Sequence, residues 1–181
     1  MKPIVVSPDP RLNQVCKPCT PGDKSLKKLA KEMTKAMYAT SGVGLAAPQL
    51  GENIRLVVID VDYDPDDART RDAIVLVNPE IMELKGDPVI EKEGCLSCPG
   101  IFIPVERKPW ARVRYYDLAG DLWEISGDDL LGRCLQHEID HLEGITLFES
   151  CLPSVKLTAL RQYEEAKAAG AKPGDVSIKG E

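Results

Sequence analysis

The stretch QHEIDH at residues 136–141 holds both histidines of this 181-residue chain, His137 and His141. A spacing of four places two side chains on the same face of a helix, so both imidazoles can reach one metal ion. Glu138 follows the first histidine, about 100° further round the helix. That position lets its carboxylate act on water beside the metal without binding the metal itself. The HExxH pattern therefore predicts a metal centre that activates water.

The segment from Ser126 to Glu143 is predicted to be the helix that carries this centre. Ser126 and Asp129 have the spacing of a capping box, and Gly144 is placed to end the helix. Leu130 and Cys134 fall on the same stripe as the two histidines. We expect these two side chains to line a pocket beside the metal.

Two histidines leave a catalytic metal site one protein ligand short, and three completions are open. A zinc peptidase would take Glu164 or Glu165 from a later helix. A structural zinc site would instead use four thiolates, Cys16, Cys19, Cys95 and Cys98, from the two CxxC pairs, although their separation is unusually large. In the third completion, Cys95 alone joins the histidines and the fourth position stays open for water.

Composition excludes several classes of protein. The chain carries 23 basic and 29 acidic residues, for a net charge of −6, which argues against a general binder of DNA or of membrane surfaces. No apolar run approaches the roughly 20 residues of a membrane-spanning helix. The N-terminal residues lack the pattern of a signal peptide, so six cysteines suggest a reducing compartment with free or metal-bound thiols.

The remaining pattern predicts a single α+β domain over residues 1–169 and a flexible tail over residues 170–181. Short antiparallel strands are expected to pack around the HExxH helix. Helices are predicted at residues 25–40, where Ser25 can cap the first turn, and at residues 153–169. Strands are predicted at residues 54–61, 74–77, 89–92, 101–105, 111–117 and 122–125. The acidic stretch at residues 62–72 lacks the central glycine and closing glutamate of a calcium loop, so it is predicted to be a solvated loop.

Three segments together resemble the signature motifs of the peptide deformylases, in that family's order. They are GVGLAAPQ at residues 42–49, EGCLS at residues 93–97 and QHEIDH at residues 136–141. The likeness extends from the arm SPDPRL at residues 7–12 to about Leu160. It implies a hydrolase that removes the formyl group from the N-terminal formylmethionine of new proteins.

The resemblance also implies roles for particular residues. Cys95, His137 and His141 correspond to the family's metal ligands, and Glu138 corresponds to its catalytic acid and base. Gln49 resembles the side chain, and Leu96 the backbone N–H, that donate to the substrate carbonyl oxygen. The ion is expected to be ferrous iron, with zinc, nickel or cobalt as alternatives. Cys98 and Arg133 depart from the commonest family pattern.

The peptide is expected to bind in an extended conformation beside the glycine-rich loop. Its path would involve Val43, Gly44 and Gly94, with Leu130 and Cys134 near the methionine side chain. The implied partners are N-formylmethionyl nascent polypeptides at the ribosome, with neither DNA nor a membrane involved. The implied location is the cytoplasm of a bacterium or the interior of an organelle.

Two further charged residues, beyond the ligands and the catalytic glutamate, are expected to support the site. Glu93 is placed to orient one of the metal ligands. Arg107 is a candidate ion-pair partner for Asp140.

Overall fold

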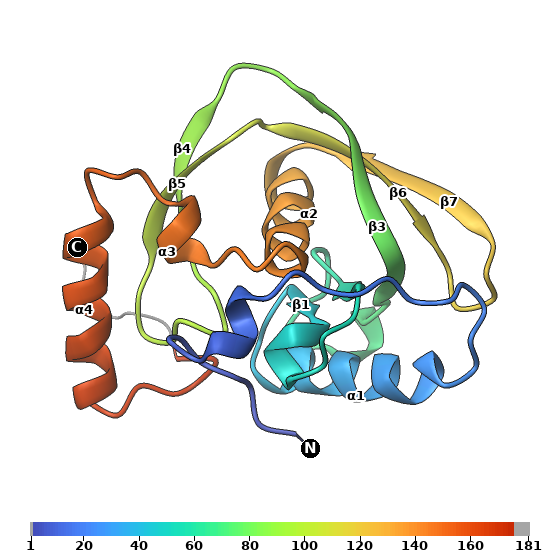
Figure 1. Ribbon diagram of the computed structural model, residues 1–181, viewed down its shortest axis with the longest axis horizontal. Helices are drawn as coiled ribbons and strands as arrows, with labels where there is room; N and C mark the ends of the chain where they lie inside the picture. Colours follow the sequence, from blue (N-terminus) through green and yellow to red (C-terminus); the bar gives the residue numbers. More distant parts are fainter. Residues whose placement is uncertain (1, 176–181) are drawn as a thin grey trace.

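The computed structural model describes residues 2–175 and has an α+β architecture in which α2 occupies the centre (Figure 1). The helices are α1 (Leu26–Ala39), α2 (Asp129–Leu142), α3 (Leu147–Ser150) and α4 (Lys156–Ala168), with short 3-10 turns at Pro10–Asn13, Ala47–Leu50 and Ala68–Thr70. The strands are β1 (Gly44–Ala46), β2 (Leu56–Ile59), β3 (Ile74–Lys85), β4 (Val89–Glu93), β5 (Ile103–Arg107), β6 (Trp110–Tyr116) and β7 (Leu122–Gly127). This confirms the predicted fold class.

The strands form two antiparallel sheets. The larger sheet has the order β1-β2-β3-β6-β7, and β4 pairs with β5 in a separate hairpin. Because β1 is the first strand of the larger sheet, one of its two backbone edges has no neighbouring strand within residues 2–175. Among residues 2–175, no helix combines the length and the apolar character needed to cross a bilayer.

Helices α1 and α2 cover opposite faces of the larger sheet. Successive residues of β2 point to opposite faces, so Leu56 and Val58 pack with α1 whereas Val57 and Ile59 pack with α2. All four side chains are buried. The middle of the apolar run predicted at residues 54–61 is therefore a strand, β2, that is covered on both faces.

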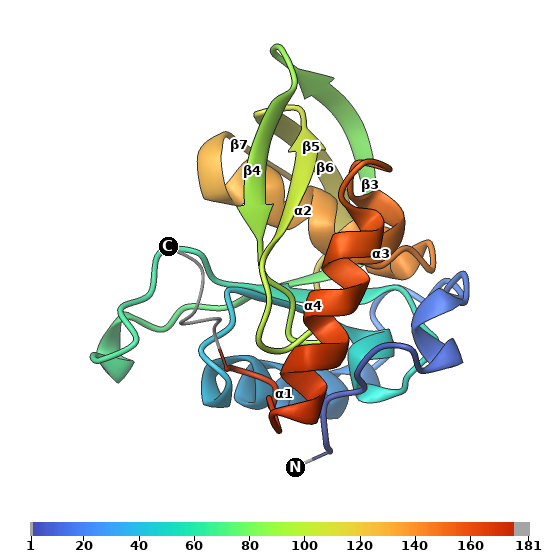
Figure 2. The same cartoon turned by 90° about the vertical axis from the view of Figure 1, so that its left-hand side faces the viewer.

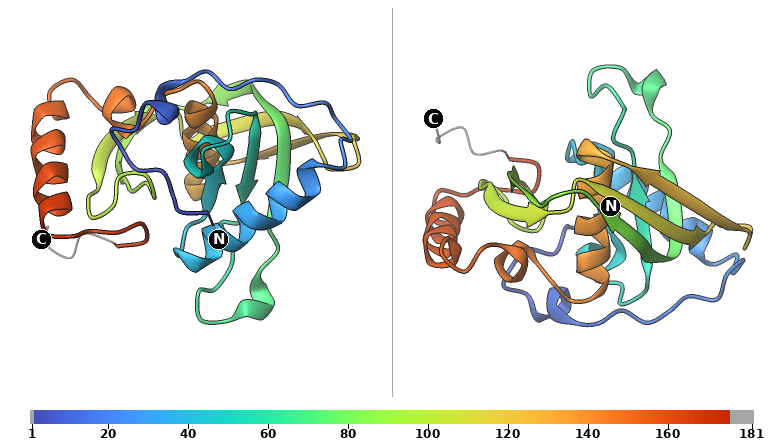
Figure 3. Two further views of the ribbon diagram at one scale, coloured as in Figure 1. Left: turned by 60° about the horizontal axis from the view of Figure 1, so that its bottom comes forward. Right: turned by 90° about the horizontal axis from the view of Figure 1, so that it is seen from above.

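A third apolar cluster lies under the β4–β5 hairpin. Helices α3 and α4 pack there through Phe148, Ala159 and Tyr163, beside Cys98 and Ile103. Figure 2 shows α4 lying beside the lower end of the hairpin. The arm over residues 2–25 runs along the body and returns to α1 (Figure 3).

Several predicted element boundaries were wrong. Ser126 does not cap α2, because it belongs to β7 and pairs with Arg112; Asp128 takes the N-cap position without a side-chain hydrogen bond. Ser25 precedes α1 but also makes no side-chain cap bond. Gly144 does end α2 as predicted, with a φ of 73°.

Residues 170–175 of the predicted tail make backbone hydrogen bonds with the body of the protein. The Gly100 N–H donates to the Asp175 carbonyl at 3.1 Å, and the Ala171 N–H donates to the Ala166 carbonyl at 3.0 Å. The part of the tail prediction that concerns residues 176–181 lies outside the described residues.

Candidate metal centre and active site

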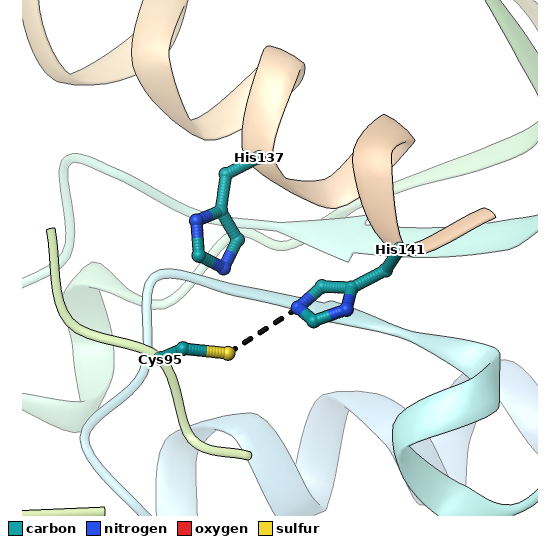
Figure 4. Close-up of side chains that lie close together, drawn as sticks. All are labelled: Cys95, His137 and His141. Atoms are coloured by element: carbon teal, nitrogen blue, oxygen red, sulfur yellow. Dashed lines mark hydrogen bonds between the residues drawn. The ribbon is translucent and has the colours of Figure 1, made fainter. Parts of the chain in front are cut away.

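Three side chains from two segments converge beside α2. The Cys95 Sγ atom lies 3.3 Å from His141 Nε2, and one ligand atom each from Cys95, His137 and His141 lie within 4.8 Å of one another (Figure 4). Among residues 2–175, no other group of His, Cys, Asp and Glu is arranged for metal binding in this way. The two histidines are one turn apart on α2, as the HExxH spacing predicts.

Glu93 fixes the orientation of His137 and lies at the centre of a buried ionic network. Its carboxylate is 3.0 Å from His137 Nδ1 and accepts hydrogen bonds from Arg107 at 2.6 Å and from Arg133 at 2.8 Å. Burial opposes its ionisation, but the hydrogen bonds from His137 and Arg107 outweigh burial and lower the pKa of Glu93 to about 2. Because Nδ1 is engaged, His137 Nε2 remains to bind a metal.

Arg107 and Arg133 connect this network to its surroundings. Arg107 donates to Asp140 at 2.8 Å, which confirms the pair suggested from the sequence. Arg133 is buried among Glu93, Glu91 and the carbonyls of the hairpin strands, where it ties α2 to β4 and β5.

Cys95 is in the loop that joins β4 to β5. A turn closes behind it, in which the Cys98 N–H donates to the Cys95 carbonyl at 2.9 Å. The hydrogen bond with the Cys98 side chain, helped by the two nearby histidines, lowers the pKa of Cys95 well below its usual value despite burial. A thiolate at this position is the form that binds a metal.

Gln49 reaches the same place from the 3-10 turn that follows β1. Its Oε1 accepts from the Ala46 N–H at 2.9 Å, and its Nε2 donates to Ser97 Oγ at 3.1 Å and lies 3.6 Å from Cys95 Sγ. Ser97 in turn donates to the Val5 carbonyl at 2.7 Å. Sequence reasoning did not anticipate Ser97, although it lies within the EGCLS motif.

Glu138 is buried beside the three converging side chains. Its Oε2 atom has no hydrogen-bond partner among the residues described. Burial raises the pKa of Glu138, although the two histidines partly oppose the shift. A Cβ atom at Gly44 would collide with Glu138 Oε1 and come within 2.9 Å of Cys134 Sγ, so glycine is what permits this close approach.

The groups at this centre suit a divalent metal. One thiolate and two imidazoles form a donor set used by zinc and by ferrous iron, nickel and cobalt. Three protein ligands leave a coordination position open, as catalytic sites require. The unpartnered Glu138 oxygen beside them is a polar atom that water or substrate can satisfy.

The two other completions of the metal site do not form. Glu164 and Glu165 are exposed on α4, and Glu164 pairs with Lys167 at 2.7 Å. Cys16 and Cys19 are free thiols that belong to other clusters, so the CxxC pairs do not assemble a four-thiolate site.

The residues predicted to contact substrate lie in different environments. Cys134 is buried with its thiol 3.8 Å from the Val43 carbonyl, whereas Leu130, in the first turn of α2, is 50% exposed. The Leu96 side chain packs against Gly42, and the Phe102 ring packs against Gly94. At both glycines the neighbouring side chain occupies the space that a Cβ atom would need.

This fold and this set of groups define a metal-dependent hydrolase. The family model described as polypeptide deformylase matches residues 1–156. The chain therefore belongs to the polypeptide deformylase family, and it is an enzyme that removes the N-terminal formyl group from nascent peptides.

Individual relatives agree with this assignment. Peptide deformylase of Bartonella tribocorum is 46% identical over 144 residues, which are 80% of this chain and 80% of that protein. Peptide deformylase of Rhodopseudomonas palustris (strain TIE-1) is 36% identical over 172 residues, 95% and 98% of the two chains. The crystal structure of a peptide deformylase from Legionella pneumophila superimposes with a TM-score of 0.84 at 39% identity, covering 94% of this chain and 97% of that chain. A Synechococcus elongatus peptide deformylase in complex with actinonin gives 0.80 at 34% identity, covering 97% and 91%.

Proposed function

We propose that this enzyme hydrolyses the formamide of N-formylmethionyl nascent polypeptides at a single divalent ion held by Cys95, His137 and His141. The observation that supports this most directly is the convergence of these three side chains beside a buried Glu138 oxygen without a partner. We further propose ferrous iron as the native ion, with zinc, nickel or cobalt able to occupy the site. The reaction is proposed to occur at the ribosome, in the cytoplasm of a bacterium or inside an organelle.

Amide resonance makes the formyl carbon a poor electrophile, so the site must activate both carbon and water. A divalent ion held there supplies Lewis acidity, which polarises the formyl carbonyl and lowers the pKa of water towards about 7. Glu138 takes a proton from the attacking water and delivers it to the leaving amine. Formate and a free N-terminus are the products.

Two donors are proposed to stabilise the negative charge that develops on the formyl oxygen. They are the Gln49 side-chain amide and the Leu96 backbone N–H. One such donor is typically worth about 3–4 kcal/mol in the transition state. The bond between Gln49 Oε1 and the Ala46 N–H holds the amide so that its nitrogen faces the metal ligands.

The free edge of β1 is proposed to bind the peptide as an added strand. The Val43 carbonyl already accepts the Asp60 N–H, on the side of β2. Backbone groups alternate in direction along an antiparallel strand, so those of Gly44 point to the free edge. Val43 and Gly94 are proposed to border the bound peptide, with Leu130 and Cys134 near the methionine side chain.

Replacing Cys95 tests the proposal. Cys95→Ser is expected to lose most bound metal and to release no formate above background from formyl-Met-Ala-Ser, because a hydroxyl is a far poorer ligand than a thiolate. Cys19→Ser, the same change at a thiol outside the site, should keep one metal per chain and full activity. If Cys95→Ser retained both metal and turnover, the proposed ligand set would be wrong.

Anaerobic purification followed by metal analysis identifies the native ion. With ferrous iron, activity should fall after purification in air and return when nickel or cobalt is added. Full activity in air with zinc bound would instead identify zinc.

A further inference from the structure

The segment at residues 60–73 joins β2 to β3 and projects from the body of the protein (Figures 2 and 3). It contains the acidic stretch, which holds no metal-binding cluster among the residues described. Its outer part is stabilised locally, for example by the Asp67–Arg69 ion pair at 2.8 Å. The part of the segment nearest to β2 and β3, which we call its base, instead folds back onto the loop that precedes β1.

Tyr63 makes the contact at this base. Its hydroxyl donates to the Gly42 carbonyl at 3.1 Å, and its side chain is buried. Burial raises the pKa of Tyr63, so the hydroxyl keeps its proton and remains a donor. Gly42 is two residues from Gly44, which lies in β1 at the free edge of the sheet and whose Cα faces Glu138.

A second layer holds Tyr63 in place. Its ring packs edge-on against Tyr38, with the centroids 4.9 Å apart. The Tyr38 hydroxyl donates to Asp60 Oδ2 at 2.5 Å, and the Asp72 N–H donates to the same oxygen at 2.8 Å. The Arg71 guanidinium lies 4.7 Å over the Tyr38 ring. These contacts connect the start of the segment, at Asp60, with its end, at Arg71 and Asp72, and they hold Tyr38 against Tyr63.

The same base also holds the next residue of the β1 loop. The Asp60 N–H donates to the Val43 carbonyl at 2.8 Å. Two consecutive carbonyls, of Gly42 and Val43, are thus fixed by residues at the start of the segment. Glycine backbone is the most conformationally free in a chain, and at Gly42 the N–H is held by the Met37 carbonyl at 2.9 Å, so the Tyr63 hydroxyl supplies the restraint on the carbonyl side.

We infer that Tyr63 is a positioning residue for peptide binding. By holding the Gly42 carbonyl, it fixes the edge of β1 in the conformation to which the substrate backbone adds. This inference rests on the proposed function and assigns the 60–73 segment a role in substrate binding. A rigid edge lowers the entropic cost of pairing with an extended peptide.

Tyr63→Phe removes the hydroxyl and keeps the ring. For formyl-Met-Ala-Ser, KM should rise about fivefold, the ratio expected for one neutral hydrogen bond, while kcat stays unchanged. For formyl-Met amide, which has no residue after methionine to pair with β1, KM should stay unchanged. Calorimetry with the unformylated peptide Met-Ala-Ser should show the same weakening in Kd, as a measure of binding independent of turnover.

Tyr163→Phe is the matched control. Tyr163 is also buried and donates to a backbone carbonyl, that of Ser7 at 2.8 Å, but it lies under the hairpin, away from β1. It should not change the ratio of the two KM values. Tyr38→Phe, one contact further from Gly42, should give the length-dependent pattern of Tyr63→Phe with a smaller rise and serves if Tyr63→Phe does not fold.

The inference is overturned if KM rises equally for both substrates, if kcat falls instead, or if the control behaves like Tyr63→Phe. Failure of the proposed function has a different signature, because then the metal-loaded wild-type enzyme itself would release no formate from either substrate.

Discussion

At the scale of single residues, Glu138 is the position where a substitution should remove activity without changing the fold or the bound metal. The carboxylate is buried next to the ligands, and the raised pKa that burial causes brings it closer to the range useful for general base catalysis. Glu138→Gln preserves size and removes the base. We expect it to keep the fold and one metal per chain but to lose about 10²–10⁴-fold in turnover.

The measurement pairs metal content with formate release on the same sample of Glu138→Gln. His141→Ala is the comparison, because it removes a ligand and should lose metal and activity together. Near-normal turnover in Glu138→Gln would mean that water has another base. Loss of the metal would mean that Glu138 is a ligand, and the open coordination position would have to be abandoned.

At the scale of elements, the face of β1 at Gly44 must approach α2 closely enough for Glu138 to lie against it. Gly44→Ala would push a Cβ into Glu138 Oε1 and against Cys134 Sγ. Both neighbours are held on α2, so we expect the carboxylate to be displaced and kcat to fall at least about tenfold, consistent with the sensitivity of catalysis to misplacement on the ångström scale. Metal content should not change.

Gly42→Ala is the matched change two residues earlier. Its Cβ would meet Leu96 Cδ1 at 2.8 Å, the end of a flexible side chain that can move. Steady-state kinetics should therefore show a much smaller fall in kcat than for Gly44→Ala. Equal effects at the two glycines would indicate a general disturbance of the loop instead of a specific approach to Glu138.

The β4–β5 hairpin is joined to α2 by charges as well as by apolar packing. Glu93 on β4 receives hydrogen bonds from Arg107 on β5 and from Arg133 on α2, and all three side chains are buried. Glu93→Gln removes one of the two carboxylates that pair with each buried guanidinium, so that Arg107 keeps Asp140 and Arg133 keeps the exposed Glu91. Leaving a buried charge with no partner costs about 3–5 kcal/mol, so we expect a smaller loss than this in the free energy of unfolding, measured by urea unfolding of the metal-free protein.

The same substitution weakens the orientation of His137. Loss of a carboxylate behind a ligating histidine typically lowers metal affinity about 10–100-fold, measurable by competition with a chelator. Glu91→Gln is the control, since Glu91 pairs with the same Arg133 at 2.7 Å but is exposed. If both variants lowered metal affinity by the same small factor, the buried network around Glu93 would not be what supports the metal centre.

At the scale of the whole molecule, the order of the predicted elements gives the fold class, and spacing within short segments predicts α1, α2, α4 and the convergence of the two histidines. The choice of Cys95 as the third group comes from the resemblance to the peptide deformylases, because spacing alone leaves three completions open. The strand predicted at residues 74–77 ends at Val77, just before Asn78 and Pro79. In the structure β3 continues to Lys85, and a shift in its pairing with β6 accommodates Asn78 and Pro79. Pairing across strands thus overrides a local signal that would end the strand.

The remaining errors have the same origin. Ser126 has a capping pattern locally, but pairing with β6 recruits it into β7. The four-residue α3 is too short to show periodicity, although its capping box between Thr146 and Glu149 was a usable signal. At the site, the contacts of Ser97 and Tyr63 join residues far apart in the sequence, and no spacing rule predicts such contacts.

The third apolar cluster joins the C-terminal helix to the loop that carries Cys95. Tyr163 on α4 is 2% exposed, packs on Phe148 with the ring centroids 5.4 Å apart, and lies in the cluster that contains Cys98. Tyr163→Ala would leave a cavity the size of an aromatic ring and an unpartnered Ser7 carbonyl. We expect a loss of about 3–5 kcal/mol in the free energy of unfolding measured by urea titration, the range for large aromatic residues replaced by alanine in a core.

Leu157→Ala on the same helix is the control. This side chain is 82% exposed, so its replacement should change the free energy of unfolding by less than about 0.5 kcal/mol. Because none of the three ligands lies on α4, Tyr163→Ala should still bind one metal per chain when folded. A small loss of stability would mean that α4 is only loosely attached, and the Cys95 loop would then have to be held by β4, β5 and α3 without its help.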